Sequence, residues 1–300
     1  MTGPAFGAVH REHAAALSAA GLDPAEVEGV VRRALEEDLA LGPDVTTEST
    51  VSPRAQATGD IVPRSPGMLA GIPVAAAVFD LVGRGEVDVE LLAVDGTAAR
   101  PGEPVLTVAG PARALLTAER TALNLIGHLS GIATLTRHWV DAGVGSKAAI
   151  RDTRKTLPGL RALEKYAVRC GGGVNHRMAL GDAALIKDNH VAAAGGIRQA
   201  VDAVRAHAPT IPLEVECDTL DQVREALAAG VQLILLDNFG LDDTVAAVDL
   251  ARGTGCRLEA SGGLTLDRAG EVAATGVDYL AVGALTHSAP VLDLGFDLRG

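Results

Sequence analysis

Short apolar stretches recur along the second half of the chain, with helix-like stretches between them. The apolar stretches lie near residues 148–152, 183–188, 211–217, 233–238, 257–261 and 279–283, and helical patterns cover 196–207, 220–229, 242–251 and 266–274. Each apolar stretch is nearly continuous, as expected of parallel strands that crossover helices bury on both faces. None leads into the glycine fingerprint of dinucleotide binding. The pattern therefore favours a closed or nearly closed α/β barrel over an open dinucleotide-binding sheet.

The first part of the chain mixes helices and strands without this regularity. Asp23 before Pro24 is typical of a helix N-terminus and predicts a helix through Glu37. Gly or Pro bounds the predicted strands, which lie near residues 56–62, 87–92 and 104–108. A helix from about 113 to 129 follows, and Gly131 is expected to begin the second region. This order indicates an α+β layer ahead of the barrel.

Composition restricts the class of protein. With 48% apolar residues in 300, the chain can bury a sizeable core. Its three cysteines form no CxxC pair, which argues against a disulfide framework or a zinc site and fits a reducing cytosol. The longest apolar stretch, 68–82, contains Pro73 and Asp80 and is shorter than the roughly 20 residues that span a bilayer. We therefore expect a cytoplasmic protein with no membrane partner.

Positive charge is concentrated between residues 151 and 187. This segment holds eight Lys or Arg against three acids, a net charge of +5, whereas the whole chain carries −12. A nucleic-acid partner would require a broad basic face, and base stacking would require more than 2% aromatic residues. The pattern instead predicts a pocket for a small anion and no nucleic-acid partner.

Polar residues follow the predicted barrel strands at the point where each strand ends. They are Arg151, Asp152, Lys187, Asp188, Glu214, Glu216, Asp237, Asn238, Glu259, Ser261 and Gly283. In α/β barrels the functional groups lie at the carboxyl ends of the strands. We therefore expect these positions to form an active site.

Two carboxylates, Glu214 and Glu216, share one face of a strand because side chains alternate with period two. Asp237 ends the next strand and is expected to lie near them. Such a group could bind Mg²⁺ or accept hydrogen bonds from sugar hydroxyls. A structural ion pair with a neighbouring Lys or Arg is the alternative, and the sequence leaves it open.

Other residue types suit anions. Small residues at 261–263 and 282–284 let backbone N–H groups approach a phosphate, whose usual place in a barrel is the last two strand–helix loops. His176, Arg177, Arg154 and Lys155 suit a carboxylate. Arg120 lies in a helical stretch, and nothing in its spacing singles it out. The residues thus indicate an enzyme for a phosphorylated sugar and an anionic co-substrate.

The reaction stays open on these grounds alone. A barrel aldolase or lyase could use Lys187 as a Schiff-base amine. A non-catalytic anion-binding protein is a further alternative, although the dense row of charged strand ends favours catalysis.

Eight motifs together resemble the quinolinate phosphoribosyltransferase family. They are the runs 119–124 (ERTALN), 130–134 (SGIAT), 152–159 (DTRKTLPG), 171–177 (GGGVNHR), 186–190 (IKDNH), 214–216 (EVE), 236–238 (LDN) and 259–263 (EASGG). The resemblance extends from about residue 25 to the C-terminus, in order and at natural spacing.

The resemblance implies an α/β fold with two domains and a homodimer with shared active sites. It places an N-terminal α+β sandwich at 21–130 that 288–300 joins, and a partly open TIM-like α/β barrel at 131–287. Residues 1–20, which lack an apolar core of the signal-peptide kind, are expected to form a flexible tail. The implied reaction joins quinolinate to 5-phosphoribosyl 1-diphosphate in NAD biosynthesis and releases CO₂ and diphosphate to give nicotinate mononucleotide. A relative acting on a monocarboxylate, such as nicotinate, is the nearest competitor.

The resemblance also implies roles for individual residues. The quinolinate site consists of Arg120 from the partner subunit with Thr153, Arg154, Lys155, His176, Arg177 and Lys187. The phosphoribosyl diphosphate site consists of Lys155, Lys187, Glu216, Asp237, Ser261, Gly262, Gly263, Val282, Gly283 and Ala284. Mg²⁺ is expected at Glu216 and Asp237, and the catalytic residues are expected to be Lys155, Lys187, Glu216 and Asp237.

Overall fold

The computed structural model describes residues 6–299, which form two compact units. The first unit comprises the chain up to Leu135, the segment Leu157–Gly171 and the residues from Ser288 onward. The second comprises Thr136–Thr156 and Gly172–His287. The two units are an α+β layer and a barrel-like α/β layer, as the sequence predicts.

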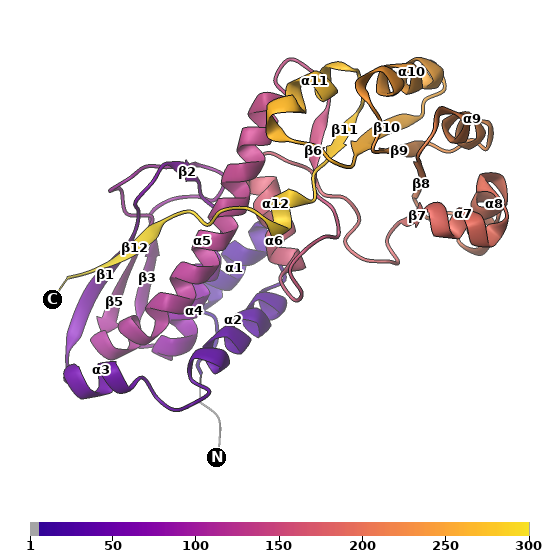
Figure 1. Ribbon diagram of the computed structural model, residues 1–300. Coiled ribbons are helices and arrows are strands. Elements are labelled where there is room, and N and C mark those ends of the chain that lie inside the picture. The colour runs from indigo at the N-terminus through magenta and orange to yellow at the C-terminus, as the bar shows by residue number, and fades with distance from the viewer. Residues whose placement is uncertain (1–5, 300) are drawn as a thin grey trace. The chain divides into compact units, whose positions relative to one another are not determined.

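A four-stranded antiparallel sheet forms the first unit, in the order β12-β1-β5-β3 (Figure 1). Its strands are β1 (Gln56–Pro63), β3 (Asp88–Leu91), β5 (Leu106–Pro111) and β12 (Leu294–Arg299), and a small ribbon joins β2 (Gly67–Met68) to β4 (Ala98–Ala99). The end of the chain therefore returns to this unit as an edge strand, with Ile61 opposite Phe296.

The first unit also contains helices. They are α1 (Arg11–Ala19), α2 (Pro24–Asp38), α3 (Val45–Thr50), α4 (Ile72–Gly83), α5 (Ala112–Ala142) and α6 (Arg161–Cys170). Helix α4 packs on β3 and β5, and α1 and α2 pack on α4. Phe79 of α4 stacks on Phe296 of β12, with ring centroids 5.9 Å apart. The apolar stretch at 68–82 is thus the buried centre of a layered unit.

Helix α5 runs without a break past the position where a new domain was expected. Gly131 lies inside it, and a Cβ there would lie 2.1 Å from the carbonyl oxygen of Pro290. Ser130 Oγ contacts the backbone of Ala70, and Thr134 Oγ1 accepts from Met68 N at 2.8 Å. The small and hydroxylated residues at 130–134 therefore bring two chain segments against the helix.

Six parallel strands form the second unit, in the order β6-β11-β10-β9-β8-β7. They are β6 (Ala149–Arg151), β7 (Ala184–Ile186), β8 (Leu213–Cys217), β9 (Leu233–Asp237), β10 (Arg257–Ser261) and β11 (Tyr279–Ala281). Within residues 6–299, β6 and β7 are the two edges of this sheet, so the barrel is partly open.

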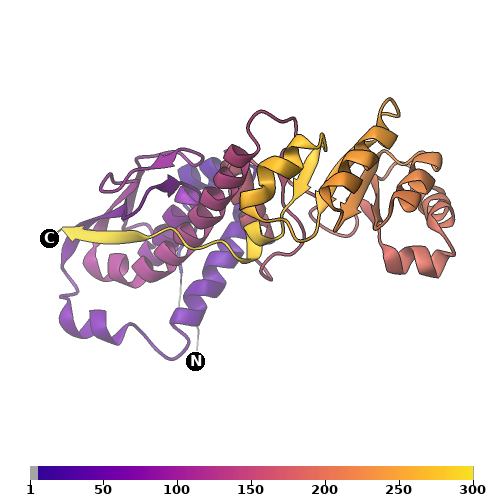
Figure 2. The ribbon, with the colours of Figure 1, turned by 45° about the horizontal axis from the view of Figure 1, so that its top comes forward.

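Helical segments follow the strands of this unit in the chain. They are α7 (Asp188–Ala194), α8 (Ile197–His207), α9 (Leu220–Ala228), α10 (Leu241–Ala251), the 3₁₀ turn η1 (Leu266–Arg268), α11 (Ala269–Ala274) and α12 (Ala284–His287). Figure 2 shows α8 to α11 along one side of the sheet, where each contacts one strand. The candidate site described below lies at the carboxyl ends of the strands.

The structure corrects two expected boundaries. Residues 1–20 were expected to be a flexible tail, but α1 spans Arg11–Ala19 with His13 and Leu17 buried, while residues 1–5 lie outside the described part. The segment Leu157–Gly171, expected in the barrel, belongs to the first unit. The reason is packing, because Tyr166 of α6 donates to Asp95 of that unit at 2.6 Å.

No described helix combines the length and apolar character needed to cross a membrane.

Candidate active site

A pocket of about 430 Å³ lies at the carboxyl ends of the barrel strands. Its walls are Thr153, Arg154, Lys155, His176, Arg177, Leu185, Lys187, Glu216, Leu235, Asp237, Glu259, Ser261 and Ala281. Nine of these residues are among those that the sequence singles out for ligand binding. The structure therefore brings the basic segment and the strand-end carboxylates into one cavity.

The basic wall of the pocket, which contains Arg154 and Arg177, suits an anion. Partial burial lowers the pKa of Arg177, and the neighbouring Arg154 lowers it further. The buried Nε of Arg154 has no hydrogen-bond partner among the described residues. Two guanidinium groups that repel each other, one with an unsatisfied donor, are stabilised by a ligand with carboxylate or phosphate oxygens.

Hydrogen bonds within the unit hold the loop after β6. Lys155 N donates to Thr153 Oγ1 at 3.0 Å, and Thr286 Oγ1 donates to the carbonyl of Lys155 at 2.8 Å. Gly283 lies against this loop, since a Cβ there would be 3.0 Å from Lys155 Cδ. The last strand–helix turn thus supports the residues that carry the positive charge.

The carboxylate wall contains an ion pair. Glu216 at the end of β8 pairs with the ammonium of Lys187, so the ion-pair alternative holds for this residue. Asp237 at the end of β9 accepts a hydrogen bond from Asn238 Nδ2 at 2.7 Å. These oxygen donors suit Mg²⁺, which binds to one or two protein carboxylates together with substrate phosphates.

The turn after β10 has the conformation expected of a phosphate loop. Gly262 and Gly263 adopt φ of +83° and +58°, and a Cβ on Gly262 would lie 2.2 Å from Asn238 Oδ1. Gly262 therefore requires glycine, and the left-handed backbone at Gly263 favours it. Ser261 lines the main pocket, while the two glycines line a small adjoining cavity with Thr265 and Arg268.

Val282 does not belong to the second expected phosphate turn. It is buried, and its N–H donates to the carbonyl of Arg151 at 2.9 Å. This hydrogen bond continues the pairing between β11 and β6, so the N–H of Val282 is not available to a phosphate. Gly283 and Ala284 begin the turn beyond it.

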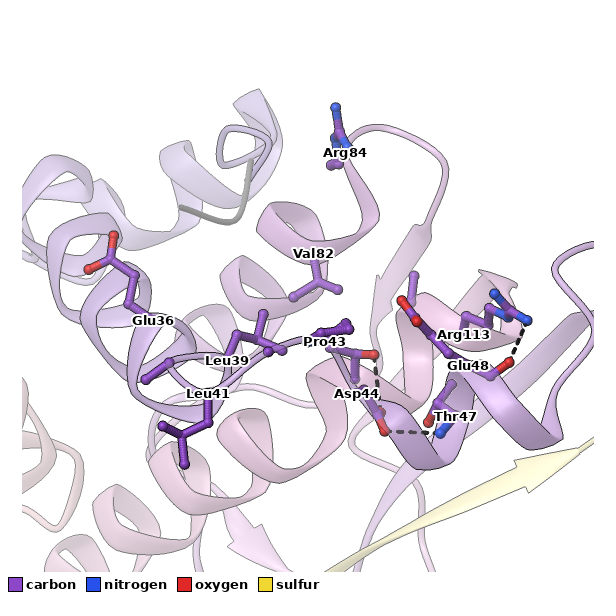
Figure 3. A pocket seen from close by; sticks show the side chains of 14 residues that line it. Glu36, Leu39, Leu41, Pro43, Asp44, Thr47, Glu48, Val82, Arg84 and Arg113 are labelled. Carbon is purple, nitrogen blue, oxygen red and sulfur yellow. Dashed lines mark hydrogen bonds between the residues drawn. The ribbon is translucent and has the colours of Figure 1, made fainter. Parts of the chain in front are cut away.

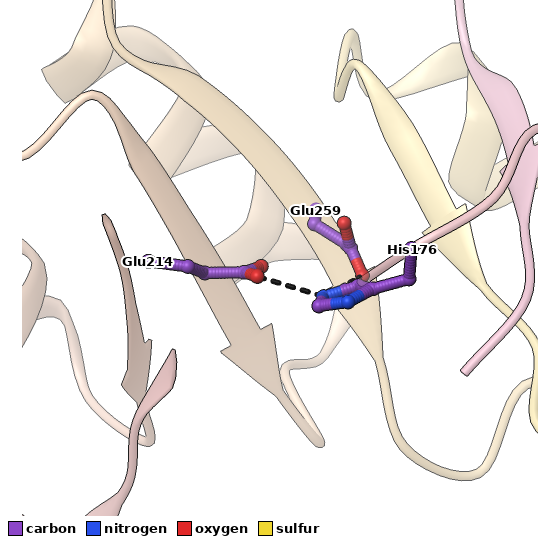
Figure 4. A group of neighbouring side chains, drawn as sticks. All are labelled: His176, Glu214 and Glu259. Carbon is purple, nitrogen blue, oxygen red and sulfur yellow. Dashed lines mark hydrogen bonds and ion pairs between the residues drawn. The ribbon is translucent and has the colours of Figure 1, made fainter. Parts of the chain in front are cut away.

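Three buried side chains meet at the base of the pocket (Figure 4). His176 Nε2 lies 2.7 Å from Glu214 and 3.8 Å from Glu259. The sequence placed Glu214 beside sugar or metal, but it faces His176 instead. Glu259 is one of the strand-end residues expected at the site, but the sequence assigned it no partner; its period-two relation to Ser261 puts both on the pocket face.

Arg120 is not among the residues that line the pocket. It belongs to the first unit, and its side chain is 65% exposed beside Glu119.

A larger hollow of about 1130 Å³ also lies in the first unit, between the loop after α2 and helices α4 and α5 (Figure 3). Its polar side chains serve the fold, since Asp44 caps α3 and Arg113 donates to the carbonyls of Val51 and Glu48. The convergent charges lie in the barrel pocket, and we place the site there.

Known proteins match the chain over nearly its whole length. Residues 44–130 match the N-terminal domain of quinolinate phosphoribosyl transferase, and residues 132–297 match its C-terminal domain. The chain belongs to the quinolinate phosphoribosyl transferase family.

Individual relatives agree with this assignment. A nicotinate-nucleotide pyrophosphorylase [carboxylating] of Mycobacterium leprae is 58% identical over 271 residues, which cover 89% of this chain and 95% of the relative. The solved nicotinate-nucleotide pyrophosphorylase of Francisella tularensis is 38% identical with a TM-score of 0.87, covering 91% of this chain and 96% of that one. NadC of Streptococcus pyogenes is 40% identical with the same TM-score, covering 93% and 97%. This member of the quinolinate phosphoribosyl transferase family therefore shares the fold of both units with its relatives.

Proposed function

We propose that this enzyme transfers the phosphoribosyl group of 5-phosphoribosyl 1-diphosphate to quinolinate, releasing diphosphate and CO₂ to form nicotinate mononucleotide for NAD biosynthesis. The observation that carries the proposal is one pocket that contains both strand-end carboxylates and two guanidinium groups, one of which has an unsatisfied donor. The family assignment supplies the two substrates that such a pocket would hold.

The basic wall suits quinolinate because that substrate has two adjacent carboxylates. Arg154 and Arg177 present planar forks that can bind a carboxylate through two parallel hydrogen bonds. Lys187 adds a third positive charge, and Thr153 and Lys155 close the same wall. A monocarboxylate would leave part of this buried charge unpaired, which is unfavourable.

The opposite wall suits the sugar phosphate. We assign Glu216 and Asp237 to the ribose hydroxyls and to Mg²⁺, which when bound would neutralise the departing diphosphate. Ser261, Gly262 and Gly263 offer a turn for phosphate oxygens beside this wall, and Gly283 and Ala284 a second one. Lys155 lines the same pocket, and we assign it to both substrates.

The reaction follows from the way the pocket places the two substrates. Orientation in one cavity brings the ring nitrogen of quinolinate to the anomeric carbon of the sugar, and the N–C bond forms as diphosphate leaves. Positive charge that develops on the sugar is stabilised by Glu216 and Asp237. The bond between the ring carbon next to the pyridinium nitrogen and its carboxylate then breaks, and CO₂ departs. The electron pair of that bond stays on the ring carbon, where the positive nitrogen stabilises it until a proton adds there.

We also propose a homodimer in which Arg120 completes the partner's quinolinate site, and a cytoplasmic location. Exposure of the Arg120 side chain and of the apolar Leu41 supports an intersubunit surface on the first unit. Cys170, Cys217 and Cys256 are all unpaired, which supports a reducing compartment.

The direct test is to incubate the protein with Mg²⁺, phosphoribosyl diphosphate and quinolinate and to measure nicotinate mononucleotide. We expect nicotinate to be a very poor substrate, and phthalate, which has two adjacent carboxylates but no ring nitrogen, to compete with quinolinate. Comparable turnover of nicotinate would contradict the assignment of the basic wall.

A lyase that uses Lys187 as a Schiff base is the second candidate, and the structure disfavours it. Lys187 Nζ is engaged by Glu216, whereas attack on a carbonyl needs an amine whose lone pair is free. Borohydride trapping of a carbonyl substrate on Lys187 would establish that candidate instead.

A further inference from the structure

Asp152 follows β6 in the chain and is a buried carboxylate to which the proposed reaction assigns no role. Its side chain is fully buried, and it is not among the residues that line the pocket. Burying a carboxylate is unfavourable unless hydrogen bonds satisfy its oxygens. The groups that donate to Asp152 therefore indicate what this residue does.

Residues 174–176 run beside the end of β6 and pair with it. Val174 N donates to the carbonyl of Ile150 at 2.8 Å, and Asp152 N donates to the carbonyl of Val174 at 3.2 Å. In a regular parallel ladder the next bond would run from His176 N to the carbonyl of Asp152. Here His176 N donates to the side-chain oxygen Asp152 Oδ1 at 2.8 Å. The carboxylate thus continues a ladder that the backbone leaves.

This exchange allows the two segments to diverge while they stay joined. Asn175 Nδ2 donates to the other oxygen, Asp152 Oδ2. We call the bonds from Asp152 to Asn175 and His176 the Asp152 clamp. Arg154 follows Asp152 by two residues, and Arg177 follows His176 by one. One carboxylate therefore ties together the two segments that carry the guanidinium groups of the basic wall.

The two guanidinium groups need such a constraint. Burial lowers the pKa of Arg177 and the charge of Arg154 lowers it further, so the two groups repel each other in the ligand-free protein. Arg177 Nη1 donates to the carbonyl of Ala183 at 2.9 Å, which holds the far end of this side chain. The Asp152 clamp holds the backbone just before it. Arg177 is thus fixed at both ends against the repulsion.

We propose that Asp152 is a positioning residue for the dicarboxylate substrate, because its clamp sets the separation of the Arg154 and Arg177 guanidinium groups. Two adjacent carboxylates need both groups at a fixed separation, whereas the sugar phosphate is assigned mainly to the opposite wall. Loss of the clamp should therefore act selectively on the dicarboxylate. This inference rests on the proposed function for the identity of its ligand, but the clamp belongs to the ligand-free protein.

Two other roles for Asp152 predict different behaviour. If it only stabilised the fold, its loss would weaken both substrates alike. If its negative charge were what mattered, an uncharged side chain of the same shape would fail as alanine does. Asparagine separates these cases, because its amide oxygen can still accept from His176 N and the Asn175 amide can rotate to accept from its nitrogen.

The experiment is calorimetric titration with phthalate and, separately, with Mg²⁺ and phosphoribosyl diphosphate. Asp152→Ala should weaken phthalate binding by about 10- to 100-fold, as for residues that orient binding groups from behind, while sugar-phosphate binding changes little. Asp152→Asn should recover most of the phthalate affinity.

Asp278→Ala is the matched control for the loss of a carboxylate. Asp278 also accepts from one backbone N–H and one side chain, Leu258 N at 2.9 Å and Lys147 Nζ at 2.7 Å, but it lies at the other end of the strands. Its loss should lower stability and leave both affinities unchanged.

Hydrogen exchange of the His176 amide in the ligand-free protein provides a readout independent of any ligand. The amide should be protected in wild type, in Asp152→Asn and in Asp278→Ala, and should lose protection in Asp152→Ala. If circular dichroism shows that Asp152→Ala does not fold, Asn175→Ala takes its place. This change removes only the side-chain bond of the clamp and should weaken phthalate binding by about 2- to 10-fold.

Three results would overturn the proposal. The first is equal weakening of both ligands, or of neither, in folded Asp152→Ala or in Asn175→Ala. The second is a folded Asp152→Asn protein that binds phthalate no better than the alanine variant. The third is a His176 amide that stays protected in Asp152→Ala. Wild type that binds phthalate but forms no nicotinate mononucleotide from quinolinate would instead overturn the proposed function and leave the clamp standing.

Discussion

At the scale of single residues, the ion pair between Lys187 and Glu216 links the two halves of the pocket. Lys187 is assigned to the carboxylates of quinolinate and Glu216 to the ribose, yet the two side chains bind each other in the ligand-free protein. Each substrate therefore competes with a bond that is already present. Binding of one substrate should therefore change the affinity of the pocket for the other substrate.

Glu216→Ala and Asp237→Ala separate the two walls. Each should weaken binding of phosphoribosyl diphosphate with Mg²⁺ by more than about tenfold, since a hydrogen bond to a charged group contributes roughly 1.5–3 kcal/mol. Phthalate affinity should be unchanged in Asp237→Ala and unchanged or higher in Glu216→Ala, which releases Lys187. Calorimetric titration of each ligand measures this, with the exposed Asp218→Ala as control. Weaker phthalate binding with normal sugar-phosphate binding would reverse the roles of the walls.

At the scale of elements, helix α5 shows how one glycine decides a packing contact. Gly131→Ala should destabilise the protein by about 1–3 kcal/mol, because the new methyl group would overlap Pro290, which is 2.1 Å away. The control is Gly29→Ala in α2, where the Cβ would lie 3.5 Å from the flexible end of Arg33. That change should stabilise by about 0.5–1 kcal/mol, as expected for alanine in an open helix. Denaturant unfolding gives both values, and equal signs would contradict the account.

Helix α1 provides a pH-dependent contact. His13 lies 2.7 Å from Asp80 of α4, and the hydrogen bond to that carboxylate raises the pKa of His13 from 6.5. Because the folded value is above the unfolded one, the stabilisation is complete below about pH 6.5 and is lost as the pH rises through the raised pKa. The protection factors of the amides of residues 11–19, which remove the intrinsic acceleration of exchange by base, should fall over that upper range in wild type. In His13→Gln this pH dependence should disappear, and an unchanged profile would remove the ion pair from the account.

Sequence reasoning located the barrel strands because each is an apolar run with a polar end. Some of those end residues line the pocket, namely Lys187, Glu216, Asp237, Glu259 and Ser261. It missed α4, whose buried residues surround the whole helix, so that no periodicity marks it. It also missed α1 and the attachment of α6 to the first unit, which depend on partners far away in the chain. For the same reason the sequence could show that Glu214 and Glu216 share a face, but not that Glu214 faces His176 while Glu216 faces Lys187.

At the scale of the whole molecule, the proposed dimer carries a testable consequence. Arg120 is exposed on the first unit, and Lys187 lines the barrel pocket. Arg120→Ala and Lys187→Ala homodimers should each be nearly inactive. When the two variants are unfolded together and refolded, about a quarter of wild-type activity should return, because half the dimers are hybrids with one intact site of two.

The control is each variant refolded alone. Recovery near zero, with hybrid dimers demonstrated by differently tagged chains, would place Arg120 in its own subunit's site or outside any site.

The central claim is that one pocket couples phosphoribosyl transfer to loss of a carboxylate. It is tested most directly with quinolinate labelled in the carboxyl group next to the ring nitrogen. In the presence of Mg²⁺, release of labelled CO₂ should depend on phosphoribosyl diphosphate and should equal the nicotinate mononucleotide formed. Release of CO₂ without the sugar phosphate, or a nucleotide that retains the label, would contradict the account.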